Sequence, residues 1–236
     1  MTLEPLAEDW TRALGVVAHP DDMEYGASSA FARWTDQGKE VAYVLVTRGE
    51  AGISDMDPAE VGPLRAEEQR RSCAAVGVGT LEFLDHPDGL VVADLTLRRD
   101  LTSALRRHRP EVVVSINYRD GWGGPSWNHA DHRHVGVALL DAVRDAANPW
   151  VFPGEGGPAW SGVRFVAFSG SPNPSHAVDV SDHLERGIES LMCHELYLAH
   201  LGQRGSDPGA FLRSGAEDVG AQLGVRYATS FEVIGF

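Results

Sequence analysis

The chain has only two cysteines, Cys73 and Cys193, among its 236 residues. They cannot form a disulfide framework, and neither has a cysteine neighbour at the spacing of a metal knuckle. No apolar run approaches the roughly 20 residues that a membrane helix needs. Residues 1–10 contain three acidic residues and no lysine or arginine, unlike a signal peptide. We therefore expect a cytoplasmic protein without a membrane-spanning segment.

Positive charge is also scarce, with 20 lysines and arginines against 34 acidic residues and a formal net charge of −14. Such a surface repels phosphate backbones and anionic lipids, which argues against nucleic acid or a membrane surface as a partner. The 26 glycines and 13 prolines follow no fixed period, so collagen-like and coiled-coil structures are excluded. Apolar residues make up 43% of the chain, an ordinary globular value, and its length suits a single domain over 1–236.

Short apolar strands alternate with helical segments through the first two thirds of the chain. We predict strands at 14–18, 41–46, 81–84 and 112–116, and helices at 24–37, 64–77, 94–108 and 132–146. Because the strands are almost wholly apolar, the pattern predicts an α/β protein with a mostly parallel sheet between two layers of helices. The region 150–236 is less regular, with a loop predicted at 153–162, a strand at 164–168, a helix at 182–201 and a closing strand at 231–234.

Two stretches rich in histidine and aspartate follow strands of this sheet. His-Pro-Asp-Asp at 19–22 comes directly after the strand at 14–18, and His-Ala-Asp-His at 129–132 follows the strand at 112–116. In open α/β sheets, ligands bind where the carboxyl ends of the strands meet. Each stretch alone is also explained by a strand end and a helix cap. Together they offer two imidazoles and one carboxylate, the ligand pattern of catalytic zinc with one open position.

The remaining acidic and imidazole groups of these stretches suit hydrolysis. A metal-bound water loses its proton more easily, and the neighbouring carboxylate of Asp21 is placed to take that proton. His129 would stabilise the developing oxyanion or protonate the leaving amine. Asp131 would orient either His129 or a ligand imidazole. The set predicts a metal-dependent amide hydrolase.

These motifs resemble those of the PIG-L/LmbE-like zinc-dependent de-N-acetylases. The resemblance rests first on Ala-His-Pro-Asp-Asp at 18–22, with Gly26, and on His-Ala-Asp-His at 129–132. Three further segments match in order, at 47–52, 65–68 and 84–89, and the similarity covers about 14–140. One departure is Ala130, which stands where proline is common in the family.

The resemblance implies a Rossmann-like fold and a Zn²⁺ ion held by His19, Asp22 and His132. It implies Asp21 as the general base and His129 as its electrophilic partner. The expected reaction is attack of a zinc-bound water that removes an N-acyl group, most simply N-acetyl, from an amino sugar or related small molecule. Fe(II), Co(II) and Ni(II) accept similar ligands, so another divalent metal stays open.

Substrate contacts are expected from five further residues. Arg65 and Asp88 match positions that contact the sugar in related enzymes, and Glu50 lies in a matching segment after the strand at 41–46. Arg65 could instead be a solvated charge at a helix start, and Asp88 could instead be a turn residue. Trp122 and Trp127 lie in a glycine-rich loop where either ring could stack on a sugar or an acyl chain, or one could pack in the core.

Near the C-terminus, the family often shows a histidine followed by Ser-Gln, whereas this chain has His-Glu-Leu-Tyr at 194–197. We interpret His176, His194 and His200 as structural or surface histidines. A non-catalytic Rossmann-like nucleotide-binding protein would have a glycine-rich turn after the strand at 14–18, and the two carboxylates found there would repel a pyrophosphate. A metal-dependent esterase and a homo-oligomeric state stay open.

Overall fold

The computed structural model describes residues 3–201 and 207–236. In this part of the chain, eight strands form one sheet in the order β1-β7-β8-β6-β5-β2-β3-β4. Strand β8 runs antiparallel to its neighbours β6 and β7, and the other pairs are parallel. The predicted mostly parallel sheet is therefore confirmed.

The strands are β1 (Glu4–Pro5), β2 (Arg12–Val17), β3 (Glu40–Leu45), β4 (Thr80–Phe83), β5 (Val112–Ile116), β6 (Phe165–Ser169), β7 (His176–Asp179) and β8 (Ala228–Gly235). The helices are α1 (Asp22–Gly26), α2 (Ser28–Asp36), α3 (Pro58–Ala75), α4 (Leu95–His108), α5 (Ala130–Ala147), α6 (Leu184–Met192), α7 (Glu195–His200) and α8 (Pro208–Leu223).

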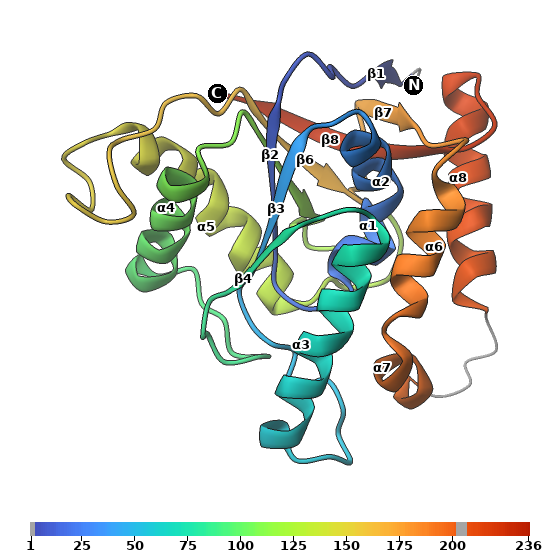
Figure 1. Ribbon diagram of the computed structural model, residues 1–236, viewed down its shortest axis with the longest axis horizontal. Helices are drawn as coiled ribbons and strands as arrows, with labels where there is room; N and C mark the ends of the chain where they lie inside the picture. The colour runs from blue at the N-terminus through green and yellow to red at the C-terminus, as the bar shows by residue number, and fades with distance from the viewer. Residues whose placement is uncertain (1–2, 202–206) are drawn as a thin grey trace.

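Helices cover both faces of the sheet and make three layers (Figure 1). Helices α4 and α5 lie on one face, and α2, α3, α6 and α8 lie on the other. Alternate residues of β2 show why: Leu14 and Val16 pack with α4 and α5, whereas Ala13 and Val17 pack into the opposite core. A strand buried on both faces must be apolar at every position, and this is the pattern that the sequence carries.

Helix α3 begins well before the predicted start at 64. Asp57 caps it, with its side chain accepting a 2.9 Å hydrogen bond from the backbone N–H of Ala59, and Pro58 occupies the first turn. Proline is well placed there because the first N–H groups of a helix have no partner within the helix. Asp57 and Pro58 thus mark the start of α3, whereas the spacing of the apolar residues alone indicated a start at 64.

Two predicted helices are each divided in the structure. The helix predicted at 24–37 is two helices, α1 and α2, because Ala27 leaves helical geometry at φ −138° and ψ 0°. The helix predicted at 182–201 is α6 and α7, separated at Cys193 and His194. The structure also contains β1, β7 and α8, which were not predicted, and β8 extends beyond the predicted 231–234 at both ends.

The chain reverses its direction of winding between β2 and β5. Strands β3 and β4 lie on one side of this adjacent pair, and β6 lies on the other. Such a switch point leaves a crevice outside the carboxyl ends of the two strands, the usual ligand position in this class of fold. The two histidine-aspartate stretches follow β2 and β5, so both lie at this crevice.

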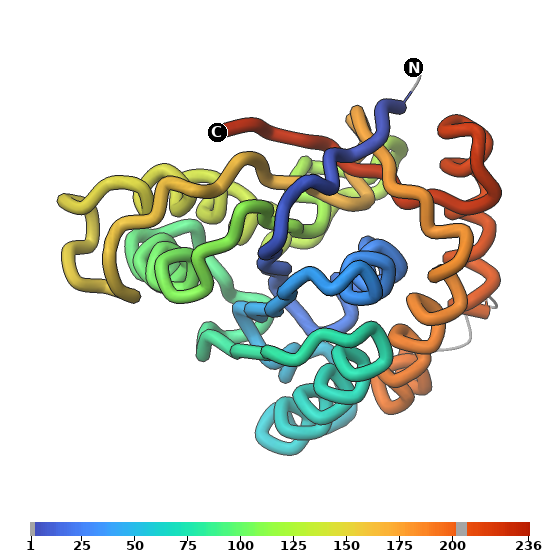
Figure 2. Tube along the Cα trace, turned by 45° about the horizontal axis from the view of Figure 1, so that its top comes forward, coloured from blue at the N-terminus to red at the C-terminus, as the bar shows by residue number. Residues whose placement is uncertain are grey.

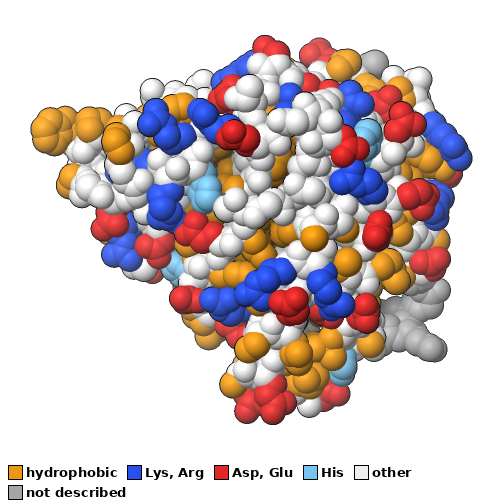
Figure 3. Space-filling model, in the orientation of Figure 1, with side chains coloured by type: hydrophobic (Ala, Val, Ile, Leu, Met, Phe, Trp, Pro, Cys, Tyr) orange, Lys and Arg blue, Asp and Glu red, His pale blue; other side chains and the backbone are white. Residues whose placement is uncertain are grey.

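Away from this crevice, the structure has a projecting loop and a surface of mixed charge. The loop at 148–162 projects beyond α4 and α5 (Figure 2). The face shown in Figure 3 carries acidic and basic side chains interspersed with one another. Across the described residues, no helix combines the length and apolar character needed to cross a membrane.

Candidate active site

The three predicted metal ligands come together at the switch point. His19 Nδ1 and His132 Nε2 are 3.2 Å apart, and Asp22 Oδ1 lies 3.0 Å from His132 Nε2. Asp22 Oδ2 lies 3.5 Å from His19 Nδ1. Zinc bonds of about 2.0–2.1 Å at tetrahedral angles place neighbouring donor atoms about 3.3 Å apart. The donor set therefore fits one divalent ion.

Local backbone geometry brings Asp22 back toward His19. The N–H of His19 donates a 2.8 Å hydrogen bond to Asp22 Oδ2, which closes the turn at the end of β2. Between them, Asp21 adopts the left-handed region at φ 88° and ψ −21°. Non-glycine residues rarely adopt this conformation, and such strain is concentrated at functional sites.

The charges around Asp22 and His19 shift the pKa values of both groups toward their charged forms. Burial raises the pKa of Asp22, but the imidazoles of His132 and His19 outweigh it and hold that pKa well below its usual range. Burial lowers the pKa of His19, and the neighbouring carboxylates of Asp22, Asp131 and Asp88 outweigh it and raise that pKa. A metal ion and a proton therefore compete for His19.

The carboxylate of Asp131 contacts Nε2 of His19, the ring nitrogen opposite the one that faces Asp22 and His132. The Nε2 atom of His19 lies 3.2 Å from Asp131 Oδ2 and 3.1 Å from Asp88 Oδ1. Asp131 is fully buried and also accepts hydrogen bonds from the backbone N–H groups of Gly89 and Val91. A carboxylate behind a ligand imidazole fixes its tautomer and direction. The Asp131 carboxylate lies closer to His19 than to His129, whose Nδ1 is 3.9 Å from Asp131 Oδ1, and its orienting role stays a prediction.

Asp21 is buried beside a single guanidinium group. Arg65 Nη2 donates a 2.8 Å hydrogen bond to Asp21 Oδ1, and the Arg65 guanidinium also donates to the carbonyls of Pro20 and Gly49. Burial raises the pKa of Asp21 to about 7, with Arg65 opposing and the charge of Asp22 reinforcing the shift. Since Arg65 is 2% exposed, its interpretation as a solvated charge is wrong.

His129 caps α5 and leaves much of its ring in the cavity. Its Nδ1 accepts a 3.1 Å hydrogen bond from the N–H of Asp131, so the neutral ring carries its proton on Nε2. Burial lowers the pKa of His129, and the adjacent His19 acts in the same direction. The ring stands edge-on to that of His19, with centroids 5.0 Å apart. A neutral imidazole with Nε2–H is a hydrogen-bond donor to this cavity.

These groups open into one cavity of about 620 Å³. Asp21, Asp88 and His129 line it together with the three predicted metal ligands, and its apolar wall is formed by Tyr25, Ile116, Trp122, Tyr197, Leu201 and Phe211. Trp127 is 69% exposed and lies under the guanidinium of Arg133, outside this lining. The two loop tryptophans therefore differ, and Trp122 is the one that faces the site.

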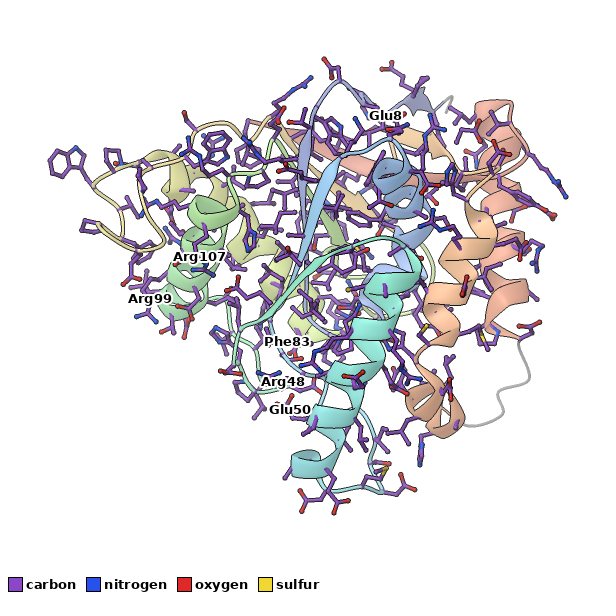
Figure 4. All side chains as sticks on the ribbon, viewed as in Figure 1. Glu8, Arg48, Glu50, Phe83, Arg99 and Arg107 are labelled. Atoms are coloured by element: carbon purple, nitrogen blue, oxygen red, sulfur yellow. The ribbon has the colours of Figure 1, made fainter. Side chains whose placement is uncertain are left out.

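Glu50 supports the site from behind. Its carboxylate accepts hydrogen bonds from the backbone N–H groups of Asp88 and Arg48. Asp88 in turn accepts one from the N–H of Ala51. Figure 4 shows Glu50 beside α3, and it is not among the residues that line the cavity. Its predicted contact with substrate stays a prediction.

The C-terminal histidines take different positions. His194 is fully buried with its Nε2 atom 3.7 Å from Glu24 Oε2, whereas His176 in β7 and His200 at the end of α7 are partly exposed and do not line the cavity. Tyr197 contributes a cavity wall, with its ring 4.0 Å from the guanidinium carbon of Arg65. Nothing in the sequence pattern marked Tyr197, because that contact depends on how α7 packs against α3.

Comparison with known proteins agrees with the motifs. The PIG-L family model, described as GlcNAc-PI de-N-acetylase, matches residues 14–143. The chain belongs to the PIG-L family. It is 29% identical to a diacetylchitobiose deacetylase of Thermococcus kodakarensis over 96% of this chain and 84% of that protein. A solved structure of the N,N'-diacetylchitobiose deacetylase from Pyrococcus horikoshii superimposes with a TM-score of 0.85 and 26% identity, covering 97% of this chain and 85% of that chain.

A second group of PIG-L relatives acts on an inositol-linked sugar. The 1D-myo-inositol 2-acetamido-2-deoxy-alpha-D-glucopyranoside deacetylase of Thermobifida fusca is 29% identical over 58% of this chain and 56% of that protein. The chain thus spans about half the length of this relative, whereas its match to the diacetylchitobiose deacetylase covers 96% of the chain.

Proposed function

We propose that this protein is a metal-dependent N-deacetylase that removes the acetyl group from an N-acetylated amino sugar, with residues 1–236 acting as one catalytic domain. One observation carries the proposal: the donor atoms of His19, Asp22 and His132 lie 3.0–3.5 Å apart in residues that line one cavity. Membership of the PIG-L family and the deacetylase names of two relatives support the choice of reaction.

Zn²⁺ is the proposed ion, because two imidazoles and one carboxylate leave an open position in tetrahedral coordination. When bound, it would polarise the amide carbonyl and lower the pKa of a water molecule. His19 and His132 would each present one nitrogen to it, and Asp22 one carboxylate oxygen.

Asp21 is the proposed base, and His129 is its proposed electrophilic partner; both line the cavity. Asp21 takes a proton from the attacking water while the water oxygen forms a bond to the carbonyl carbon of the amide. Arg65 holds the Asp21 carboxylate in place during this step. His129 donates a hydrogen bond from Nε2–H to the carbonyl oxygen as negative charge develops there. The C–N bond then breaks as the proton held by Asp21 passes to the departing nitrogen, and the products are acetate and a free amine.

Substrate recognition is proposed to involve the cavity wall. Trp122 offers an aromatic face to a sugar ring, while Asp88 and Arg65 form the polar side. A cavity with aromatic walls and a few convergent polar groups is typical of small-molecule sites. A cytoplasmic location and the absence of nucleic-acid partners stay predictions from the sequence, and a homo-oligomeric state stays open.

The test is amine release from three substrates after metal removal and after zinc addition. N-acetylglucosamine and N,N'-diacetylchitobiose test deacetylation, and an O-acetylated sugar without an amide tests the esterase alternative. We expect amine release from at least one amide, lost on chelation and restored by zinc. Ester hydrolysis with no amine release would contradict the proposed reaction, and activity indifferent to chelation would contradict the metal.

A further inference from the structure

A buried asparagine saturates its hydrogen bonds at the edge of the proposed metal site. Asn128 is 1% exposed and directly precedes the cap of α5. Its Nδ2 donates to the carbonyls of Asn117 at 2.7 Å and Arg119 at 3.0 Å. Its Oδ1 accepts from the N–H of His129 at 2.8 Å and lies 2.9 Å from Nδ1 of His132.

The contact with His132 determines which nitrogen can bind a metal. An amide oxygen only accepts hydrogen bonds, so Nδ1 of His132 must carry the proton. In the neutral ring, the lone pair is then on Nε2, the atom that faces His19 and Asp22. His19 shows the opposite arrangement, since carboxylates face its Nε2 and leave Nδ1 for the ion. The two ligand rings are thus fixed by different partners.

The primary amide of Asn128 meets all the demands at this position. The two backbone carbonyls need a donor, and the N–H of His129 and the ring of His132 need an acceptor. An aspartate in place of Asn128 would keep the acceptor but turn an oxygen toward two carbonyl oxygens. A buried polar group that loses its partner costs about 1–3 kcal/mol, so full satisfaction of this amide matters for the fold as well.

Asn128 also links the ligand to the loop that carries Trp122. Its backbone N–H donates a 2.8 Å hydrogen bond to the carbonyl of Asp120, and its side chain holds the carbonyl of Arg119. The loop between these residues closes on itself through a bridge between Gly121 and Trp127. One residue therefore fixes both a ligand ring and the two ends of a cavity loop.

We propose that Asn128 is a positioning residue of the metal centre, which sets the tautomer and direction of His132 and couples this ligand to the Trp122 loop. The inference rests on the proposed metal site. Asn117 provides a matched control, because it is equally buried and uses its amide only on loop backbone, donating to the carbonyl of Gly121 and accepting from the N–H of Arg119.

The experiment measures zinc affinity of the full chain by chelator competition, together with the absorption spectrum of the Co(II)-substituted protein. For N128A we expect zinc affinity about 10- to 100-fold weaker than wild type and an altered Co(II) spectrum. For N117A we expect both to remain as in wild type. N128D keeps an acceptor for His132, so it should bind zinc better than N128A while melting at a lower temperature than wild type.

Three results would overturn the proposal: wild-type zinc affinity in N128A, an equal loss of affinity in N117A, or zinc binding by a folded N128D as weak as in N128A. If the variants do not fold, nitrogen NMR of histidine-labelled wild-type protein without zinc decides, because it must show the neutral His132 ring protonated at Nδ1. Failure of the wild type to bind zinc would instead contradict the proposed function.

Discussion

Arg65 donates a 2.8 Å hydrogen bond to the carboxylate of Asp21, and both side chains are buried. Arg65 is fixed in turn by two backbone carbonyls and by the ring of Tyr197. The guanidinium thus holds the proposed base from a position where Arg65 also lines the cavity. This arrangement explains how Asp21 keeps one orientation in spite of its strained backbone.

R65K should therefore lower kcat while leaving zinc affinity unchanged. Lysine cannot reproduce the planar fork of donors that serves Asp21, Pro20 and Gly49 together. Loss of one hydrogen bond to a charged group, about 1.5–3 kcal/mol, corresponds to a fall in kcat of roughly tenfold or more. Steady-state kinetics measure it, and R70K on the exposed side of α3 is the control. Equal rates in R65K and R70K would contradict the role of Arg65.

Asp21→Asn should retain the metal and lose turnover. Asparagine tolerates the left-handed backbone found at Asp21, so the turn between His19 and Asp22 is expected to persist. Without a base we expect kcat to fall by about 10²-fold or more. His19→Ala and His132→Ala should lose zinc as well as activity. Metal analysis beside kinetics separates the two classes, and a D21N protein with wild-type kcat would refute the assignment of the base.

The two loop tryptophans provide a matched pair for substrate binding. Trp122 lines the cavity, whereas Trp127 is exposed outside it. If the Trp122 ring stacks on the sugar, W122A should raise KM by roughly threefold to tenfold, the equivalent of about 0.5–1.5 kcal/mol. W127A should leave KM unchanged. A raised KM in W127A with an unchanged KM in W122A would contradict the stacking of the Trp122 ring on the sugar.

Glu8 should make the stability of the protein depend on pH in the acidic range. Burial raises the pKa of Glu8, but hydrogen bonds from Arg33 and Trp34 outweigh it and lower that pKa (Figure 4 labels Glu8 beside α2). A carboxyl group with a lowered pKa in the folded state stabilises above its unfolded pKa, and this contribution is lost as pH falls through the folded pKa.

E8Q should accordingly unfold more easily than wild type at pH 7, by about 0.5–1 kcal/mol because the group is partly exposed to solvent. The difference should shrink as pH falls below the folded pKa, where wild-type Glu8 is protonated. Urea unfolding at several pH values measures both quantities. A difference that stays constant from pH 7 into the acidic range would argue against the ionised pair.

Much of the site could be predicted because its ligands lie within short stretches next to strands. The stretches at 19–22 and 129–132 follow β2 and β5, and these strands are neighbours in the sheet. Parallel strands bring their carboxyl ends to one edge, so the distant histidines meet there. The tautomer of His132 could not be predicted, because Asn128 was one polar residue in a loop with no periodic pattern.

The C-terminal region was less predictable for a physical reason. Helix α8 has an Asp-Pro start, but Gly209, Gly215 and Gly220 interrupt its sequence, and glycine lowers helix propensity by about 1 kcal/mol per residue. Its formation therefore depends on packing against α6 and β8 rather than on local sequence. The same holds for Tyr197, whose contact with Arg65 joins α7 to α3 across the fold.

Anomalous diffraction from crystals of the zinc-loaded protein locates the ion independently of activity. We expect one strong peak within about 2.0–2.2 Å of His19 Nδ1, His132 Nε2 and an Asp22 carboxylate oxygen, facing the cavity beside Asp21. A peak elsewhere, or an ion held by only one of these three side chains, would contradict the proposed metal site.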